Sequence, residues 1–165
     1  MSQNSQPVIV ITGAAGNLGQ AVARKFHAQN YRLALLDRSE QSLQSLVGEF
    51  GDNATAYAVD LIDEDSVKQC IESIISDLGS IDILANVAGG FSMGPLLQDT
   101  AKKDWDFMFD LNARSVFNTC RQVLPQMLKQ NGKGRIINIA ARAALQGKGK
   151  MGPYCASKSA VITLT

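Results

Sequence analysis

The sequence contains one histidine, three cysteines and no long apolar run, and each scarcity excludes a class of protein. His27 lies near the end of an expected helix, where the helix dipole favours a histidine and no catalytic role is needed. Cys70, Cys120 and Cys155 form no close C-x-x-C pair, and we interpret them as reduced, structural thiols. No apolar stretch approaches the roughly 20 residues that span a bilayer. Serine–histidine hydrolysis, a metal site and a membrane-spanning segment are therefore not expected.

The charge of the chain gives no indication of a nucleic-acid or membrane partner. The formal net charge is +1, and we interpret the basic residues as scattered, so neither a nucleic acid nor a membrane is an expected partner. The first residues, MSQNSQPVIVITG, lack the basic region and apolar stretch of a secretory leader. The expected setting is cytoplasmic, and the expected partner is a small-molecule substrate.

Short apolar runs alternate with helical patterns along the whole chain. Strands are expected at 7–11, 31–37, 54–61, 81–90 and 135–141; helices at 18–30, 39–50, 63–79 and 100–134, the last as one piece or two, and from 152 onward. Five alternations predict an α/β fold, a Rossmann-type doubly wound parallel sheet with helices on both faces. Residues 1–165 are expected to form one nucleotide-binding domain. Because the sequence stops within an apolar helix, it is expected to be a truncated fragment, or to need a partner that covers the sheet edge.

The stretch ITGAAGNLGQAV follows the first expected strand and opens a helix. In such a turn Gly13 permits the sharp bend, Gly16 lets the backbone approach a pyrophosphate, and Gly19 permits close helix–strand packing. A purely structural glycine turn is the alternative. The flanking strand and helix favour phosphate binding.

Acidic residues end the second and third expected strands. Asp37 stands where a carboxylate would accept hydrogen bonds from an adenosine ribose and repel a 2′-phosphate, which favours NAD over NADP. Arg38 weakens this preference, because a guanidinium tolerates that phosphate. Asp60, followed by Leu61, could reach the adenine, although a turn or helix-capping role fits an aspartate there almost as well.

Two asparagines complete the pattern. Asn86 and the glycines of NVAGG follow the fourth strand, where backbone can pass close to a flat ligand or simply turn. Asn112 lies inside a helical stretch, where asparagine has poor propensity, so it is either solvated or kinks the helix and holds a water.

Tyr154 and Lys158 stand four positions apart, which places both side chains on one face of a helix. A cation beside a phenol favours the phenolate form, so the tyrosine is a plausible proton donor. The preceding segment NIAARAALQG contains no serine, threonine or histidine.

Together, TGAAGNLG, Asp37, Asp60, NVAG, LNARSVF and YCASK resemble the short-chain dehydrogenase/reductase family over the whole chain from Val8. The resemblance implies an NAD(P)-dependent oxidoreductase in which Tyr154 is the catalytic acid/base, Lys158 assists it and binds the nicotinamide ribose, and Asn112 anchors a proton-relay water. It also implies dimers or tetramers built through the apolar faces of the long helix around residues 116–127 and of the start of the last helix. The alternative is that both faces simply cover the sheet. The cofactor-binding residues implied are Gly13, Ala15, Gly16, Asn17, Leu18, Gly19, Asp37, Arg38, Asp60, Leu61, Asn86, Ala88, Gly89, Tyr154 and Lys158.

Three features depart from the family pattern. Asn17 stands where ordinary members carry a glycine, Ala141 stands at the position of the usual catalytic serine, and two further strands with a substrate-covering loop are not present. The segment from Ala140 to Lys158 is similar to that of dihydropteridine reductases, which also have alanine there and reduce quinonoid substrates. The alternative to an enzyme is a dinucleotide-binding or regulatory module without catalysis.

Overall fold

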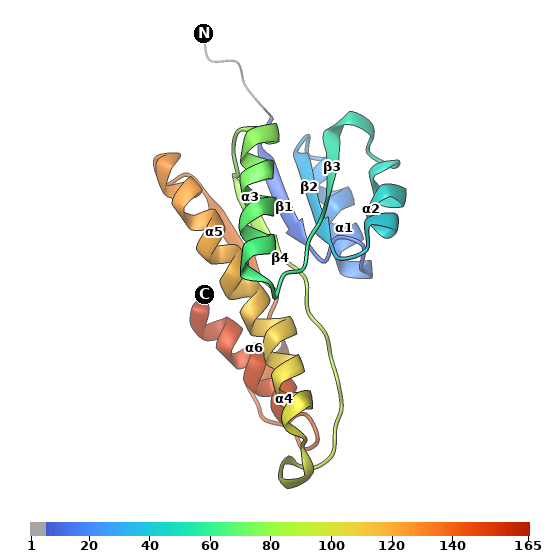
Figure 1. Ribbon diagram of the computed structural model, residues 1–165, viewed down its shortest axis with the longest axis vertical. Helices are drawn as coiled ribbons and strands as arrows, with labels where there is room; N and C mark the ends of the chain where they lie inside the picture. Colours follow the sequence, from blue (N-terminus) through green and yellow to red (C-terminus); the bar gives the residue numbers. More distant parts are fainter. Residues whose placement is uncertain (1–5) are drawn as a thin grey trace.

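The computed structural model describes residues 6–165, which form a parallel sheet with helices packed on both of its faces (Figure 1). The strands are β1 (Val8–Thr12), β2 (Arg32–Asp37), β3 (Ala54–Ala58), β4 (Ile83–Asn86) and β5 (Arg135–Asn138). The α-helices are α1 (Asn17–His27), α2 (Glu40–Val47), α3 (Glu64–Leu78), α4 (Lys102–Phe109), α5 (Ser115–Lys129) and α6 (Gly152–Leu164). The predicted α/β fold is confirmed.

The strand order is β3-β2-β1-β4-β5, with every neighbouring pair parallel. The chain first builds outward from β1 to β3 and then crosses back to place β4 on the other side of β1. The loops after β1 and β4 therefore diverge at the point where the order reverses. In doubly wound sheets ligands bind in the crevice at this point.

Alternate residues of the strands supply two separate apolar clusters. Val10, Leu36 and Leu84 face α3 and α5, where they pack among Ile71, Ile74 and Val123. Ile9, Ile11, Leu33 and Leu35 face the opposite side and pack with α1 and α2 through Ala23, Leu43 and Leu46. Because both faces are covered, the central strands are continuous runs of apolar residues, as parallel strands usually are.

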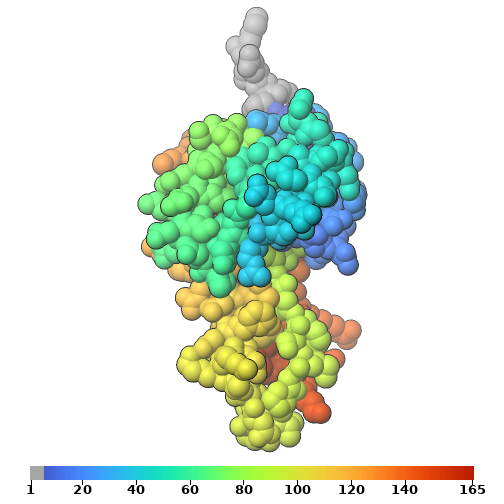
Figure 2. Space-filling view, turned by 45° about the vertical axis from the view of Figure 1, so that its right-hand side comes forward, coloured from blue at the N-terminus to red at the C-terminus, as the bar shows by residue number. Residues whose placement is uncertain are grey.

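The segments around α4 and the start of α6 form a part of the molecule that projects beyond the sheet, whereas α5 and β5 pack with the sheet itself (Figure 1). Figure 2 shows this part as the yellow and orange-red surface below the blue, cyan and green one. The helical region predicted over 100–134 is two helices, α4 and α5, joined by a π-helical turn at Asp110–Arg114. The turn contains Asn112, so the break occurs at the residue with poor helix propensity.

Three strands end earlier than predicted, β3 by three residues, β4 by four and β5 by three. In each case the extra residues leave the sheet and continue into loops at its carboxyl edge. Helix α1 ends at His27, and Asn30 follows with a positive φ of 64°. Within residues 6–165 no helix combines the length and apolar character that a membrane crossing requires.

Candidate active site

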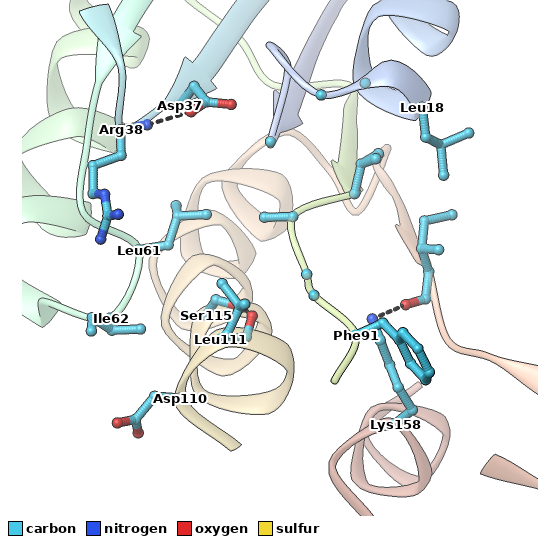
Figure 3. A pocket seen from close by; sticks show the side chains of 18 of the residues that line it. Leu18, Asp37, Arg38, Leu61, Ile62, Phe91, Asp110, Leu111, Ser115 and Lys158 are labelled. Carbon is cyan, nitrogen blue, oxygen red and sulfur yellow. Dashed lines mark hydrogen bonds between the residues drawn. The ribbon is translucent and has the colours of Figure 1, made fainter. Parts of the chain in front are cut away.

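A pocket of about 690 Å³ opens at the carboxyl edge of the sheet, and residues that follow all five strands line it (Figure 3). Gly13 follows β1, Asp37 ends β2, Asp60 follows β3, Gly89 follows β4 and Ile139 follows β5. The volume falls in the range typical of small-molecule sites. Residues scattered through the sequence are thus brought to one cavity.

Two contacts shape the glycine turn after β1, one with the backbone of Ala88 and one within the turn. Gly13 has a φ of +64°, and a Cβ atom there would lie 2.8 Å from the Cα and 2.9 Å from the nitrogen of Ala88. The Gly16 N–H donates to the Gly13 carbonyl at 3.1 Å, and Gly16 caps α1 with no side-chain hydrogen bond. The first turn of α1 holds no acidic residue. Its free N–H groups and positive dipole end suit an anion such as a pyrophosphate.

Asp37 is fixed by backbone donors. One carboxylate oxygen accepts from the Arg38 N–H at 2.8 Å, and the other accepts from the Ala15 N–H at 3.1 Å. The oxygen bonded to Arg38 also accepts from the Ser39 N–H at 3.4 Å. The carboxylate is therefore tied to the glycine turn and lies at the pocket wall, where the oxygen bonded to Ala15 keeps a lone pair for a ligand hydroxyl. The Arg38 side chain is exposed and lines the same wall (Figure 3).

The segment after β3 lines the neighbouring wall with Asp60, Leu61 and Ile62. Asp60 also has a local role, since one of its oxygens accepts from the Ile62 N–H at 3.1 Å. Asp60 is thus a turn residue that also lines the pocket, and its contact with an adenine stays a prediction. Leu61 and Ile62 present apolar surface beside it (Figure 3).

The loop after β4 is held by Thr12, whose hydroxyl accepts from the N–H groups of Val87 and Ala88, both at 3.1 Å. Gly89 comes so close to the far wall that a Cβ there would lie 2.8 Å from Asn112 Oδ1 and 2.9 Å from Lys158 Nζ. Asn86, predicted to face the ligand, instead lies behind the pocket and is 2% exposed. Its Nδ2 donates to Asn138 Oδ1 at 2.8 Å, so it ties β4 to β5.

Asn112 is fully buried, and its amide oxygen and amide nitrogen both bond to protein groups. Its Oδ1 accepts from the Gly90 N–H at 2.9 Å, while its Nδ2 donates to the Gly90 carbonyl and to Ser157 Oγ, both at 3.1 Å. Ser157 in turn donates to the Tyr154 carbonyl at 3.0 Å. The side chain therefore joins the loop after β4 to α6, and the water expected at Asn112 stays a prediction.

Helix α6 carries both members of the Tyr154–Lys158 pair to the pocket. Lys158 is 5% exposed, and its ammonium donates to the Ile139 carbonyl at 2.7 Å (Figure 3). Burial lowers the pKa of this ammonium from its ordinary value of 10.5. The Tyr154 ring packs edge-on against Phe91, with 4.9 Å between ring centroids and 87° between planes.

The segment between β5 and α6 offers the pocket no hydroxyl at the family's serine position. Ala140 lines the cavity, and Ala141 adopts an extended conformation before a short helical turn. The Ser157 and Ser159 hydroxyls donate to backbone carbonyls. Polarisation of a substrate carbonyl by a serine from this segment is therefore not available.

Most of the predicted residues meet in the pocket, but Ala15, Asn86 and Asn112 support it from behind. Sequence reasoning did not name several lining residues: Val59, Ile62, Val87, Phe91, Phe107, Asp110, Leu111, Ser115 and Ile139. Most are apolar or small and carry no chemical signature. The one feature of the sequence that could have indicated a place in the pocket is their position immediately after a strand or close to Asn112.

The family model described as short chain dehydrogenase matches residues 7–165. Sorbitol dehydrogenase of Cereibacter sphaeroides is 33% identical over 156 residues, which are 94% of this chain and 60% of that protein. The 2-(R)-hydroxypropyl-CoM dehydrogenase of Xanthobacter autotrophicus is 36% identical over 164 residues, 96% of this chain and 65% of that protein. The chain thus spans less than two thirds of the length of these relatives.

Two solved structures have the same architecture. ElxO with NADP bound has a TM-score of 0.91 at 28% identity and covers 97% of this chain, which corresponds to 65% of ElxO. NAD⁺-bound xylitol dehydrogenase has a TM-score of 0.89 at 32% identity and covers 99% of this chain, which corresponds to 64% of that protein. Sequence and structure agree, and the chain belongs to the short-chain dehydrogenase family.

Proposed function

We propose that this protein is an oxidoreductase that binds a nicotinamide dinucleotide and transfers hydride to or from a small substrate, with Tyr154 as acid/base. The observation that supports this most is the meeting of the Gly13–Gly19 turn, Asp37 and the Tyr154–Lys158 pair in one pocket. The first two suit a dinucleotide, and the last suits proton transfer beside it. Sequence relatives named as dehydrogenases and reductases support the same reaction class.

NAD is the proposed cofactor. Asp37 presents a fixed carboxylate at the position of the adenosine ribose, where a 2′-phosphate would add a second negative charge. The exposed Arg38 side chain acts in the opposite direction and permits weaker NADP binding. Solved structures of similar proteins hold NADP in one case and NAD⁺ in another, so the preference rests on Asp37.

The nicotinamide supplies hydride chemistry when bound, and the residues of this chain supply the proton and the geometry. Tyr154 gives a proton to, or takes one from, the substrate at its phenolic oxygen. Lys158 is held by the Ile139 carbonyl beside Gly89 and places positive charge in this part of the pocket. Asn112 fixes the loop that carries Gly90 and Phe91 opposite Tyr154.

The alanine at position 141 narrows the range of substrates that the site would accept. Without a hydroxyl to polarise a carbonyl, the site favours an acceptor that takes hydride readily, as conjugated or quinonoid compounds do. The likeness of residues 140–158 to dihydropteridine reductases gave the same expectation from sequence. The same alanine is the observation that favours the alternative, a dinucleotide-binding module with no turnover.

The test compares wild type with Tyr154→Phe on a panel of carbonyl and quinonoid compounds with NADH. We expect wild-type turnover on the quinonoid compounds and a loss of about 100- to 10,000-fold in the variant. NADH affinity should be unchanged, because the substitution removes one hydroxyl. A variant that keeps most of its activity would remove Tyr154 from the mechanism, and NADH binding without any wild-type turnover would favour the non-catalytic module.

Self-association and location are further proposals. Helix α5 exposes Phe117 (47%), Leu124 (44%) and Leu128 (71%) on its surface. Burial of such side chains between two copies would stabilise a dimer or tetramer. Sedimentation of wild type against Leu124→Asp would test this. Three free cysteines support a reducing, cytoplasmic setting.

A further inference from the structure

The charges of this chain are divided between two parts of the sequence. All 15 aspartates and glutamates lie within residues 1–110, whereas nine of the 16 lysines and arginines lie within residues 111–165. The second segment builds α5, β5 and α6, which form the Tyr154 side of the pocket. A charge imbalance of this size creates a positive potential that attracts anions.

Three of these cations lie on the loop that joins Ala141 to Tyr154. Arg142, Lys148 and Lys150 are exposed, and none forms an ion pair with another residue of 6–165. By contrast, Arg114 and Arg121 of α5 and the preceding turn are paired with carboxylates. These three cations add to the buried Lys158 ammonium in the pocket and to Arg38 on the opposite wall. We call the segment that carries them the basic loop (residues 142–150).

Lys150 has an unusual backbone. Its φ is 63°, a left-handed conformation that long side chains rarely adopt. Its carbonyl accepts from the Gly94 N–H at 2.9 Å, so this conformation is held against the chain that follows β4. Such strain, when fixed by a long-range bond, concentrates at functional positions.

The chain held against the basic loop is apolar and exposed. Phe91 is 57% exposed, Met93 62% and Leu97 69%. Phe91 lines the pocket and touches Tyr154, so the apolar strip (residues 91–97) begins at the proposed proton donor. In Figure 2 the yellow-green strip and the orange-red loop lie side by side at the lower right. Acidic groups nearby are Asp99, at the far end of the strip, and Asp110, which is paired with Arg114.

We propose that the substrate is an amphipathic anion. Its apolar body lies along the strip from Phe91 to Leu97, and its carboxylate, phosphate or sulfonate group binds Arg142, Lys148 and Lys150. Its reacting atom then reaches Tyr154. This inference names the substrate class of the proposed function. The reaction of the anion at Tyr154 rests on that function, whereas the binding of the anion does not.

The experiment measures binding of octanoate, octyl phosphate and 1-octanol to the chain by calorimetry, with and without NADH. Each exposed ion pair contributes a modest amount, so three together should make the anions bind roughly tenfold more tightly than the alcohol. The variant Arg142→Gln/Lys148→Gln/Lys150→Gln should lose this preference. The matched control is Lys129→Gln/Lys133→Gln/Arg135→Gln, which removes equal charge from exposed residues around the end of α5 and the start of β5.

The control should keep the preference for anions. Equal affinity for the alcohol and the anions, binding of none of the three, or the same loss in both variants would overturn the proposal. If Lys150→Gln unfolds the chain, which circular dichroism would show, Arg142→Gln/Lys148→Gln gives the same test with a smaller effect. Binding of NADH to the same samples is measured in a separate titration. Absence of NADH binding would reject the proposed cofactor, and the result for the anions would still stand.

Discussion

The two walls of the pocket contrast in how the chain builds them. The wall from Gly13 to Ile62 consists of turns that directly follow β1, β2 and β3, and its shape depends on backbone conformation, on close backbone contacts and on backbone N–H groups that bond to aspartates. The wall from Val87 to Lys158 depends on side chains that reach across the sequence, as Asn112 does to Gly90 and Lys158 to Ile139. The first wall is sensitive to added atoms, and the second to lost hydrogen bonds.

The largest loss of stability is expected at Gly13, where the first wall has no room for a side chain. In Gly13→Ala the new methyl group would lie 2.8 Å from the Ala88 Cα, and a φ of +64° adds strain. We expect a loss of about 2–4 kcal/mol in the free energy of unfolding, measured in urea. NADH binding should be lost as well, because the turn that carries it must move.

The control for this substitution is Gly51→Ala. Gly51 has a similar φ of +56°, and a Cβ there would meet no atom within 4 Å. It should lose only about 1–2 kcal/mol, from backbone strain alone. Equal losses in the two variants would show that the contact with Ala88 does not shape the turn.

Asn112→Ala tests the second wall. The substitution removes partners from both Gly90 backbone groups and from Ser157 in a fully buried place. We expect a loss of about 2–3 kcal/mol in the free energy of unfolding and weaker NADH binding. Asn118→Ala is the control, since buried Asn118 makes a single bond to the Leu61 carbonyl and should cost about 1 kcal/mol. A smaller loss at Asn112 than at Asn118 would contradict this view of the wall.

The buried Lys158 predicts a pH dependence. Because burial lowers its pKa in the folded state, the unfolded chain binds more protons between that lowered value and the ordinary 10.5. The stability of wild type should therefore rise with pH across this window, relative to Lys158→Met. Urea unfolding at several alkaline pH values measures the difference. A difference between the two proteins that stays constant or falls with pH would contradict this prediction.

The smallest effect is expected at the surface, where α5 meets α3. Arg121 and Glu64 form an ion pair at 2.5 Å, but both side chains are about half exposed. Solvent screens such a pair, so Arg121→Ala should change the free energy of unfolding by about 0.2–0.5 kcal/mol. A loss above about 1 kcal/mol would show that surface charge helps to join the two walls.

The sequence predicted the residues of the first wall better than those of the second, because the first wall is built from local sequence patterns. Apolar strands, the glycine turn and Asp37 are local patterns, so their positions follow from a few neighbouring residues. Asn86 was placed wrongly because its partner, Asn138, lies 52 residues away. The occupied amide of Asn112 could not be foreseen either, since Gly90 and Ser157 come from separate elements.

Phe91 and Phe107 show a second limit. They line the pocket and are 57% and 59% exposed, yet an apolar side chain in a sequence indicates burial in a core first. The same holds for Leu111, which the π-helical turn directs to the cavity (Figure 3). Such residues are identified as part of a site only when the fold is known.

A titration of the chain with NADH and, separately, NADPH tests the central claim most directly. Energy transfer from Trp105 on α4, which is 38% exposed and stacks on Phe109 at 4.7 Å, reports binding, and calorimetry gives an independent value. The account predicts micromolar NADH binding that is about tenfold tighter than NADPH binding, with the preference lost in Asp37→Ala. Absence of binding by either nucleotide would contradict it, because the glycine turn and Asp37 would then be structural features only.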